Sequence, residues 1–179
     1  MAHGPFDVVV AADLNWGVGR SNGLPWPRLR GDFAHFKAVT STASPDRRNA
    51  IVFGRKTWES NELGGKPLPR RLNIVISRNT LILPDGVIGA TSLQDAIDKR
   101  EDAESLFVCG GAEIYQLAIA HPALRHIYLT RVQGYFDCDV RVPDLSRDFV
   151  IDPSWPSEGL VDHEENGVHY RIQRLYRGR

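Results

Sequence analysis

The sequence has little cysteine, no excess of charge of either sign and no long apolar run. Cys109 and Cys138 are its only cysteines. One disulfide between them is conceivable, but two thiols in a reducing cytosol fit the composition better. No stretch approaches the roughly 18–20 apolar residues of a membrane span, and residues 1–12 lack the basic segment of a signal peptide. We therefore expect a cytoplasmic protein with no membrane partner.

The 22 basic residues balance 22 acidic ones, so the formal net charge is zero. A basic excess is the usual footprint of a protein that binds nucleic acid or a membrane surface, and neither partner is expected here. The sequence has no exposed heptad and no large apolar tail that would indicate oligomerisation, so we expect a monomer.

Motifs of several common enzyme classes are also missing. There is no GxxxxGK[ST] loop, no HExxH pair and no GxSxG elbow, so a P-loop NTPase, a zinc protease and a serine hydrolase are not expected. No metal site is predicted. Gly17–Gly23 approximates the dinucleotide fingerprint, but its third glycine stands one place late and Pro25 follows instead of a helix. A Rossmann interpretation therefore fails.

The length of 179 residues suits one domain, expected to span 1–179. Apolar β-branched runs predict strands at 6–12, 50–53, 72–77, 106–109, 127–132 and 168–176. Helical periodicity and capping signals predict helices at 29–40, from the capping box at 92–95 onward, and at 112–120. This alternation predicts an α/β fold around a largely parallel sheet. The last two strands have no helix between them, only an expected loop at 137–160, which predicts an antiparallel end.

Asp32 falls in the first turn of the helix expected at 29–40, where a carboxylate suits the helix dipole. Phe36 shares its side of the helix, and Phe33 stands next to it. A solvated helix-terminal acid is the ordinary interpretation. The alternative is a carboxylate in an apolar cleft walled by these rings and Trp26. There its two oxygens would accept hydrogen bonds from one edge of a flat heterocycle.

Gly110-Gly111 directly follows a predicted strand and opens a predicted helix. Such a pair lets a phosphate or a ring approach the backbone, although glycine at this turn also serves packing. Arg55–Thr57 and Ser77-Arg78 follow two other predicted strands. Because open α/β sheets bind ligands at the carboxyl ends of their strands, these residues are a candidate phosphate site. Solvated loop charge is the alternative.

Four motifs taken together resemble the dihydrofolate reductase family. They are Leu24-Pro25-Trp26 with Asp32 six residues later, Gly54–Trp58 (GRKTW), Arg71–Arg78 (RLNIVISR) and Gly110–Tyr115 (GGAEIY). Ile127–Arg131 and Asp139 to Pro143 extend the match over nearly the whole chain. The resemblance implies one domain with a mostly parallel mixed sheet of about eight strands, an antiparallel C-terminal end and about four helices. It also implies NADPH-dependent reduction of 7,8-dihydrofolate to 5,6,7,8-tetrahydrofolate, which supplies one-carbon metabolism.

The resemblance further implies a substrate site around Asp32, which would hold the pterin amidine edge and help N5 acquire a proton through water. Thr130 would hydrogen-bond that carboxylate, Trp26 would hold the water, and Arg71 would pair with the α-carboxylate of the glutamate tail. The other implied substrate residues are Val9 and Cys109, through their backbone carbonyls, and Val10, Phe33, Phe36, Lys37, Asn61, Leu68 and Tyr115.

For the cofactor, the resemblance implies NADPH more than NADH. The adenosine phosphates would be held by Arg55, Lys56, Thr57, Ser77 and Arg78, and Gly110-Gly111 would approach the pyrophosphate across a cis peptide bond. Leu24 joins the implied catalytic set, with Asp32, Trp26 and Thr130, because its loop would close over nicotinamide. The remaining implied cofactor residues are Ala11, Val18, Gly19, Gly54, Ile76, Ala112, Glu113, Ile114 and Tyr115.

The chain departs from the usual family pattern at Asn61 and Cys109, which replace apolar residues, and at Val140, which replaces a common threonine. A position that is basic in some relatives is Thr91, so recognition of the 2′-phosphate would rest on Arg78 and Arg55. Two alternatives stay open. One is a pyrimidine reductase of riboflavin synthesis, which shares the fold but would need neither the Trp26–Asp32 pair nor Arg71. The other is a non-catalytic folate- or nucleotide-binding protein.

Overall fold

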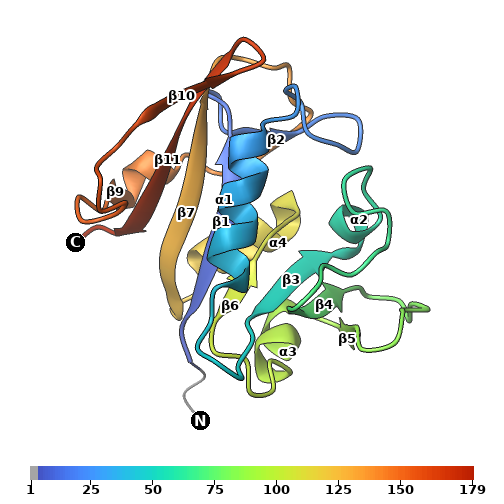
Figure 1. Cartoon of the computed structure of the whole chain (residues 1–179). Coiled ribbons are helices and arrows are strands. Elements are labelled where there is room, and N and C mark those ends of the chain that lie inside the picture. Colours follow the sequence, from blue (N-terminus) through green and yellow to red (C-terminus); the bar gives the residue numbers. More distant parts are fainter. Residues whose placement is uncertain (1–3) are drawn as a thin grey trace.

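A computed structural model of the chain describes residues 4–179 (Figure 1). Its strands are β1 (Phe6–Ala12), β2 (Gly17–Gly19), β3 (Ala50–Gly54), β4 (Leu72–Ile76), β5 (Ile88–Ala90), β6 (Leu106–Val108), β7 (Leu124–Gln133), β8 (Val140–Arg141), β9 (Phe149–Ile151), β10 (Asp162–Glu165) and β11 (Val168–Arg177). Its helices are α1 (Arg30–Ser41), α2 (Arg55–Trp58), α3 (Leu93–Asp98) and α4 (Ala112–Ala120), with a 3-10 turn at Leu145–Arg147.

Nine of the strands described within residues 4–179 form one sheet, in the order β10-β11-β7-β1-β6-β3-β4-β5, with β9 paired to β11. The five pairings from β7 to β5 are parallel, whereas β11 runs antiparallel to β7, β9 and β10. The short strands β2 and β8 form a separate antiparallel ribbon. The predicted α/β class, the mixed sheet and its antiparallel C-terminal end are confirmed.

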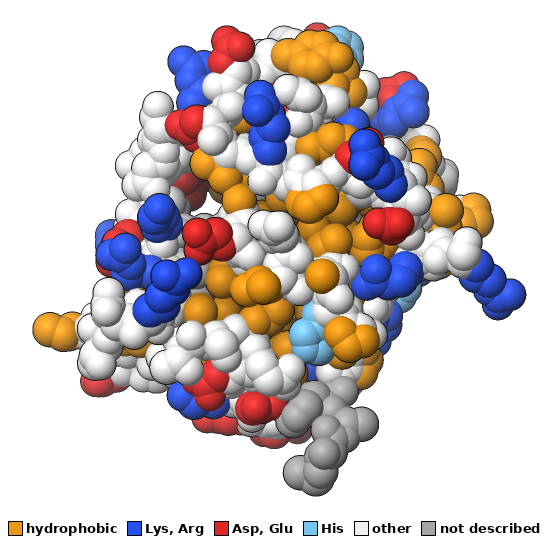
Figure 2. Space-filling view, turned by 180° about the vertical axis from the view of Figure 1, so that it is seen from behind, with side chains coloured by type: hydrophobic (Ala, Val, Ile, Leu, Met, Phe, Trp, Pro, Cys, Tyr) orange, Lys and Arg blue, Asp and Glu red, His pale blue; other side chains and the backbone are white. Residues whose placement is uncertain are grey.

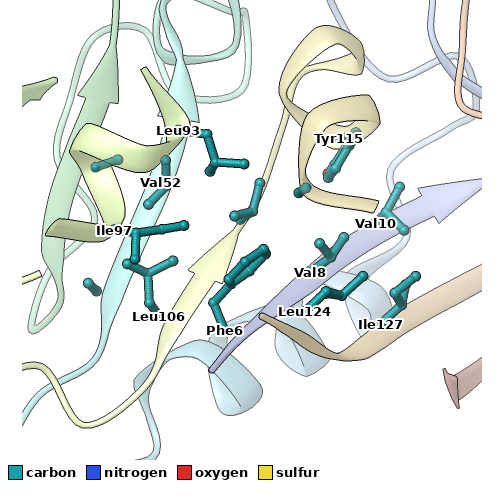
Figure 3. Close-up of a cluster of buried hydrophobic side chains, with 14 of the residues drawn as sticks. Phe6, Val8, Val10, Val52, Leu93, Ile97, Leu106, Tyr115, Leu124 and Ile127 are labelled. Carbon is teal, nitrogen blue, oxygen red and sulfur yellow. The ribbon is translucent and has the colours of Figure 1, made fainter. Parts of the chain in front are cut away.

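The central strands are apolar throughout because the sheet is covered on both faces. On one face Val8, Val10, Val52 and other buried residues pack under α3 and α4, as Figure 3 shows. On the other face Val9, Ile51 and Phe53 belong to a cluster that includes Trp58 of α2 and Phe36 of α1. Successive strand residues thus alternate between the two cores, and α1 lies on the second face (Figure 1).

Several short elements differ from the sequence-based expectation. The segment 137–160 is not all loop, because it contains β8, the 3-10 turn and β9. The strands β5 and β10 and the four-residue helix α2 were not predicted. β10 has the sequence DHEE, without apolar alternation, because it is an edge strand that pairs only with β11. Its hydrogen bonds, not side-chain burial, place it in the sheet.

Charged side chains of both signs are interspersed on the molecule seen from behind, with hydrophobic side chains gathered between them (Figure 2). This matches the balance of 22 basic and 22 acidic residues. None of the helices between residues 4 and 179 combines the length and the apolar character that crossing a bilayer demands.

Candidate functional site

Asp32 in the first turn of α1 and Thr130 on β7 are brought together by the fold. The Thr130 hydroxyl donates a hydrogen bond to Asp32 Oδ1 at 2.5 Å. Asp32 is half-buried and Thr130 is buried. Burial is the main cause that raises the pKa of Asp32, the hydrogen bond from Thr130 opposes it, and the charge of Glu165 raises it further. The site therefore holds a carboxylate that keeps its proton to higher pH than an exposed aspartate.

Two apolar clusters contain residues that are close to Asp32 in the sequence. Phe36, one turn along α1, packs in the cluster that contains Val9, and Trp26 and Leu24 pack in a third cluster with Tyr170. Trp26 Nε1 is buried, and no acceptor within residues 4–179 reaches it. A buried indole N–H of this kind can donate to a water molecule or a ligand.

The other predicted aromatic of α1, Phe33, is half-buried. The Arg28 guanidinium lies over its ring, 4.5 Å from the centroid, a cation–π contact. The same helix carries the predicted Lys37, which is exposed. These two residues therefore lie on the outer part of the site.

The backbone of β1 meets α4 at Val9, whose carbonyl accepts a hydrogen bond from the Tyr115 hydroxyl at 2.7 Å. Cys109 directly follows β6, the neighbour of β1, and burial raises the pKa of its thiol, so it is held as a neutral thiol. The Val10 side chain does not join this group. It packs in the opposite core, with Val8 and Tyr115 (Figure 3), because strand residues alternate. The expectation that it packs on the same ligand as Phe36 is corrected, and only its backbone is available.

Arg71, just before β4, is a buried cation, 7% exposed. Its Nη1 donates to Thr40 Oγ1 at 2.9 Å and its Nε to the Pro69 carbonyl at 3.0 Å. Within residues 4–179 no carboxylate forms an ion pair with it. Burial lowers its pKa, but an arginine stays protonated. The predicted Leu68 is positioned nearby through paired 2.9 Å hydrogen bonds with Asn73. A buried, unpaired guanidinium suits an anionic group of a ligand.

The loop after β2 reaches across to the segment after α2. Leu24 N donates to Glu62 Oε1 at 2.9 Å, and Asn61 N donates to the Asn22 carbonyl at 3.4 Å. These segments line a hollow of about 430 Å³ with Arg20, Ser21, Gly23, Leu24, Pro25, Asn61 and Glu62. Nothing local in the sequence indicated Glu62, since its partner lies 38 residues away.

Three glycines line the carboxyl ends of β3 and β6. The Gly110-Gly111 peptide bond is cis, as predicted. A Cβ at either glycine would lie 3.0 Å from Thr57 Oγ1, and one at Gly54 would lie 3.2 Å from Ile114 Cγ1. Gly54 N donates to the Gly110 carbonyl at 2.8 Å. Thr57 and Ile114 thus pack directly against the glycine backbone, and Gly111 remains partly exposed where α4 begins, at the positive end of the helix.

The predicted basic residues lie at this same edge of the sheet. Gly54 and Ile76 are register partners on β3 and β4, so Arg55–Thr57 and Ser77-Arg78 leave the sheet side by side. Arg55, Lys56 and Arg78 are exposed, and Arg55 pairs with Glu59 at 3.7 Å. The other predicted cofactor residues divide between Ala11 on β1, Val18 and Gly19 on β2, Ile76 on β4, and Ala112, Glu113, Ile114 and Tyr115 at the start of α4.

Comparison with known proteins agrees with this arrangement. The family model described as dihydrofolate reductase matches residues 5–177. The chain belongs to the dihydrofolate reductase family. The dihydrofolate reductase of Bos taurus is 33% identical, with 94% of this chain and 95% of that relative covered. That of Heliothis virescens is 38% identical, with 99% of each covered.

A solved structure supports the same family assignment. The Schistosoma mansoni dihydrofolate reductase superposes with a TM-score of 0.84 at 32% identity, covering 98% of this chain and 99% of that one. The family predicted from four short motifs is therefore confirmed, and with it an oxidoreductase of the dihydrofolate reductase type.

Proposed function

We propose that this protein reduces 7,8-dihydrofolate to 5,6,7,8-tetrahydrofolate with NADPH, and so supplies one-carbon metabolism. The family carries this reaction class. The observation that supports it best is the half-buried Asp32, which accepts a hydrogen bond from the buried Thr130. A single acid of raised proton affinity is the one titratable group that such a reduction requires, because the hydride comes from the cofactor.

At the substrate end, the two Asp32 oxygens accept hydrogen bonds from the amidine edge of the pterin. The buried Trp26 Nε1, which has no acceptor among the described residues, holds a water molecule that passes a proton toward N5. The carbonyls of Val9 and Cys109 accept from the same ring, and the Val9 carbonyl also accepts from the Tyr115 hydroxyl. The Val10 backbone, Phe33 and Phe36 complete the ring pocket.

At the tail end of the substrate, Arg71 pairs with the α-carboxylate of the glutamate. Its guanidinium is already oriented by Thr40 and Pro69, so little side-chain freedom is lost on binding. Leu68 lies alongside it, and Lys37 and Asn61 line the exposed mouth. The charge of Lys37 favours an anionic tail there.

Bound NADPH supplies the hydride for the reduction. The partly exposed backbone at Gly111 and the start of α4, with Gly54 and Gly110 beside it, fits its pyrophosphate, because the N–H groups at a helix start favour an anion. Arg55, Lys56, Thr57, Ser77 and Arg78 hold the adenosine phosphates. The exposed cations Arg55 and Arg78 favour a 2′-phosphate and hence NADPH over NADH. Leu24, Val18 and Gly19 exclude water over nicotinamide, and Ala11, Ile76 and Ala112–Tyr115 line its groove.

The test is to mix the purified protein with NADPH and dihydrofolate and to follow NADPH oxidation. We expect turnover with dihydrofolate, much less with NADH, and none with the pyrimidine substrate of riboflavin synthesis. Absence of turnover by folded protein that binds NADPH would overturn the reductase proposal. An Arg78→Gln variant should narrow the preference for NADPH over NADH without changing the limiting rate.

We also propose that the chain acts as a single-domain monomer over residues 1–179 in the cytoplasm. The thiols of Cys109 and Cys138 are not joined in a disulfide, which suits a reducing compartment. Sedimentation of the active protein at the mass of one chain, 20.0 kDa, tests the monomer; a dimer mass contradicts it.

A further inference from the structure

Helix α1, which carries Asp32, has no capping side chain of its own. Its N-cap residue is Leu29, which cannot accept a side-chain hydrogen bond. The Glu165 carboxylate, at the end of β10, takes that role. It accepts from Arg30 N and, at 3.0 Å, from Gly31 N, about 135 residues away in the sequence. Two of the N–H groups that every helix leaves unpaired at its start are thus satisfied by a distant strand.

The whole β10–β11 hairpin holds the segment just before Asp32. Asn166 Nδ2 donates to the Arg28 carbonyl at 2.7 Å, and the Tyr170 hydroxyl donates to Glu165 Oε1 at 3.2 Å. A Cβ at Gly31 would lie 2.3 Å from the Tyr170 hydroxyl oxygen. Glycine is therefore required at this position for the close approach of Tyr170.

We propose that Glu165 is a positioning residue of the reductase reaction: by capping α1 it fixes Asp32 against Thr130 and opposes the positive end of the helix dipole at that carboxylate. This inference rests on the proposed function. The start of a helix carries roughly half a positive charge, which favours an ionised acid in the first turn. A second carboxylate at the same helix end offsets this effect, so Asp32 keeps its proton to higher pH.

The electrostatics agree in sign with the geometry. The charge of Glu165 raises the pKa of Asp32, after the larger effect of burial. The hydrogen bonds from Gly31 and Arg30 lower the pKa of Glu165 itself. Glu165 therefore keeps its charge to lower pH than an ordinary glutamate, whereas Asp32 keeps its proton to higher pH than an ordinary aspartate.

Other titratable groups lie near Asp32 and Glu165 on α1, β10, β11 and α4. Burial raises the pKa of Tyr170 to about 12 and that of Tyr115 well above its ordinary value, so both are neutral when Asp32 titrates. Burial lowers the pKa of His35 on α1 to about 4. His163 of β10 stacks on the Tyr170 ring, with centroids 5.0 Å apart, and the guanidinium of Arg30 adds a fixed charge beside Glu165.

The decisive variant is Glu165→Gln, which removes the charge but keeps an amide oxygen to accept from the helix start. We expect the pH at which the single-turnover hydride-transfer rate is half-maximal to fall by about 0.3–0.6, because water screens a partly exposed charge. The rate above that pH should fall roughly two- to four-fold, while the limiting rate at low pH stays near that of the unchanged protein. Glu164→Gln is the matched control, since Glu164 is exposed and contacts His169 at 3.7 Å instead; its profile should not move. His163→Gln, a second control, should also leave the midpoint in place.

Direct titration of the Asp32 carboxyl by carbon NMR, in the unchanged protein and in Glu165→Gln, gives the same readout without catalysis. A downward shift of the Asp32 midpoint supports the inference. An unmoved midpoint, or equal shifts in Glu165→Gln and Glu164→Gln, overturns it. Failure of the unchanged protein to oxidise NADPH overturns only the proposed function, because the carboxyl titration is measured independently.

Discussion

The Thr130 hydroxyl donates to Asp32 Oδ1 at 2.5 Å and joins β7 to α1 across 98 residues of sequence. This bond lowers the pKa of Asp32, whereas burial and the charge of Glu165 raise it. The proton affinity of Asp32 is therefore a balance of groups on three elements. Changing Thr130 or Glu165 singly should therefore shift the pH profile of the hydride-transfer rate in a predictable direction.

Thr130→Val removes the hydroxyl while keeping the shape of the side chain. The carboxylate then loses a hydrogen bond that favours its charged form, so the midpoint of the hydride-transfer profile should move to higher pH. Single-turnover rates across pH measure this shift. Thr130→Ser should restore the original midpoint; a shift to lower pH in Thr130→Val would contradict the assigned bond.

Asp32→Asn should slow hydride transfer at neutral pH by about 100-fold or more, in the range of a lost general acid or base. The amide fills the same space but cannot carry the proton toward N5. Pre-steady-state NADPH oxidation measures the rate, and NADPH binding serves as the control for an intact fold. Unchanged activity would mean that Asp32 is only a helix-terminal charge.

The same Asp32→Asn change should stabilise the fold at neutral pH. The pKa of Asp32 is raised above its unfolded value, so the native state holds a proton that the unfolded state releases, and stability falls as pH rises through this window. Replacing the carboxylate with an amide removes this fall in stability at higher pH. The free energy of unfolding in urea should rise by about 1 kcal/mol at pH 7 and match the unchanged protein near pH 3. If Asp32→Asn and the unchanged protein differed in unfolding free energy equally at pH 7 and pH 3, the titration of Asp32 would be excluded as the cause.

Arg71→Leu should raise the KM for dihydrofolate by about 10- to 100-fold, the usual effect of losing charge-assisted hydrogen bonds, with NADPH affinity unchanged. Steady-state kinetics and NADPH binding separate the two. Arg70→Asn is the matched control, because Arg70 is exposed and has φ 63°, which asparagine tolerates. A larger effect on NADPH than on dihydrofolate would place Arg71 in the cofactor site.

Gly31→Ala should destabilise the fold by about 1–3 kcal/mol, typical of forced overpacking, since the new Cβ would meet the Tyr170 hydroxyl at 2.3 Å. Tyr170→Phe in the same chain removes that oxygen and should recover part of the loss. Urea unfolding of the two single variants and the double variant measures the coupling. Strictly additive effects would show that the two residues do not collide.

Much of the fold could be predicted because its signals are local. Apolar runs such as Phe6–Ala12 and Leu72–Ile76 form strands buried on both faces, and the capping box at Ser92 opens α3, where its hydroxyl accepts from Asp95 N. β10 was not predicted, because an edge strand held by backbone pairing does not need a periodic apolar pattern in its sequence. Leu29 at the N-cap was the one available hint that α1 is capped from elsewhere.

Residue identity, order and spacing by themselves determined the family of this protein, its α/β class and the acid at position 32. They did so because motifs and apolar periodicity are written in neighbouring residues. Only the tertiary structure decided that Val10 turns away from Phe36, and that Glu165 and Thr130 meet at the start of α1. Such contacts join residues about 100 or more positions apart, and their existence depends on strand pairing and packing that no local pattern encodes.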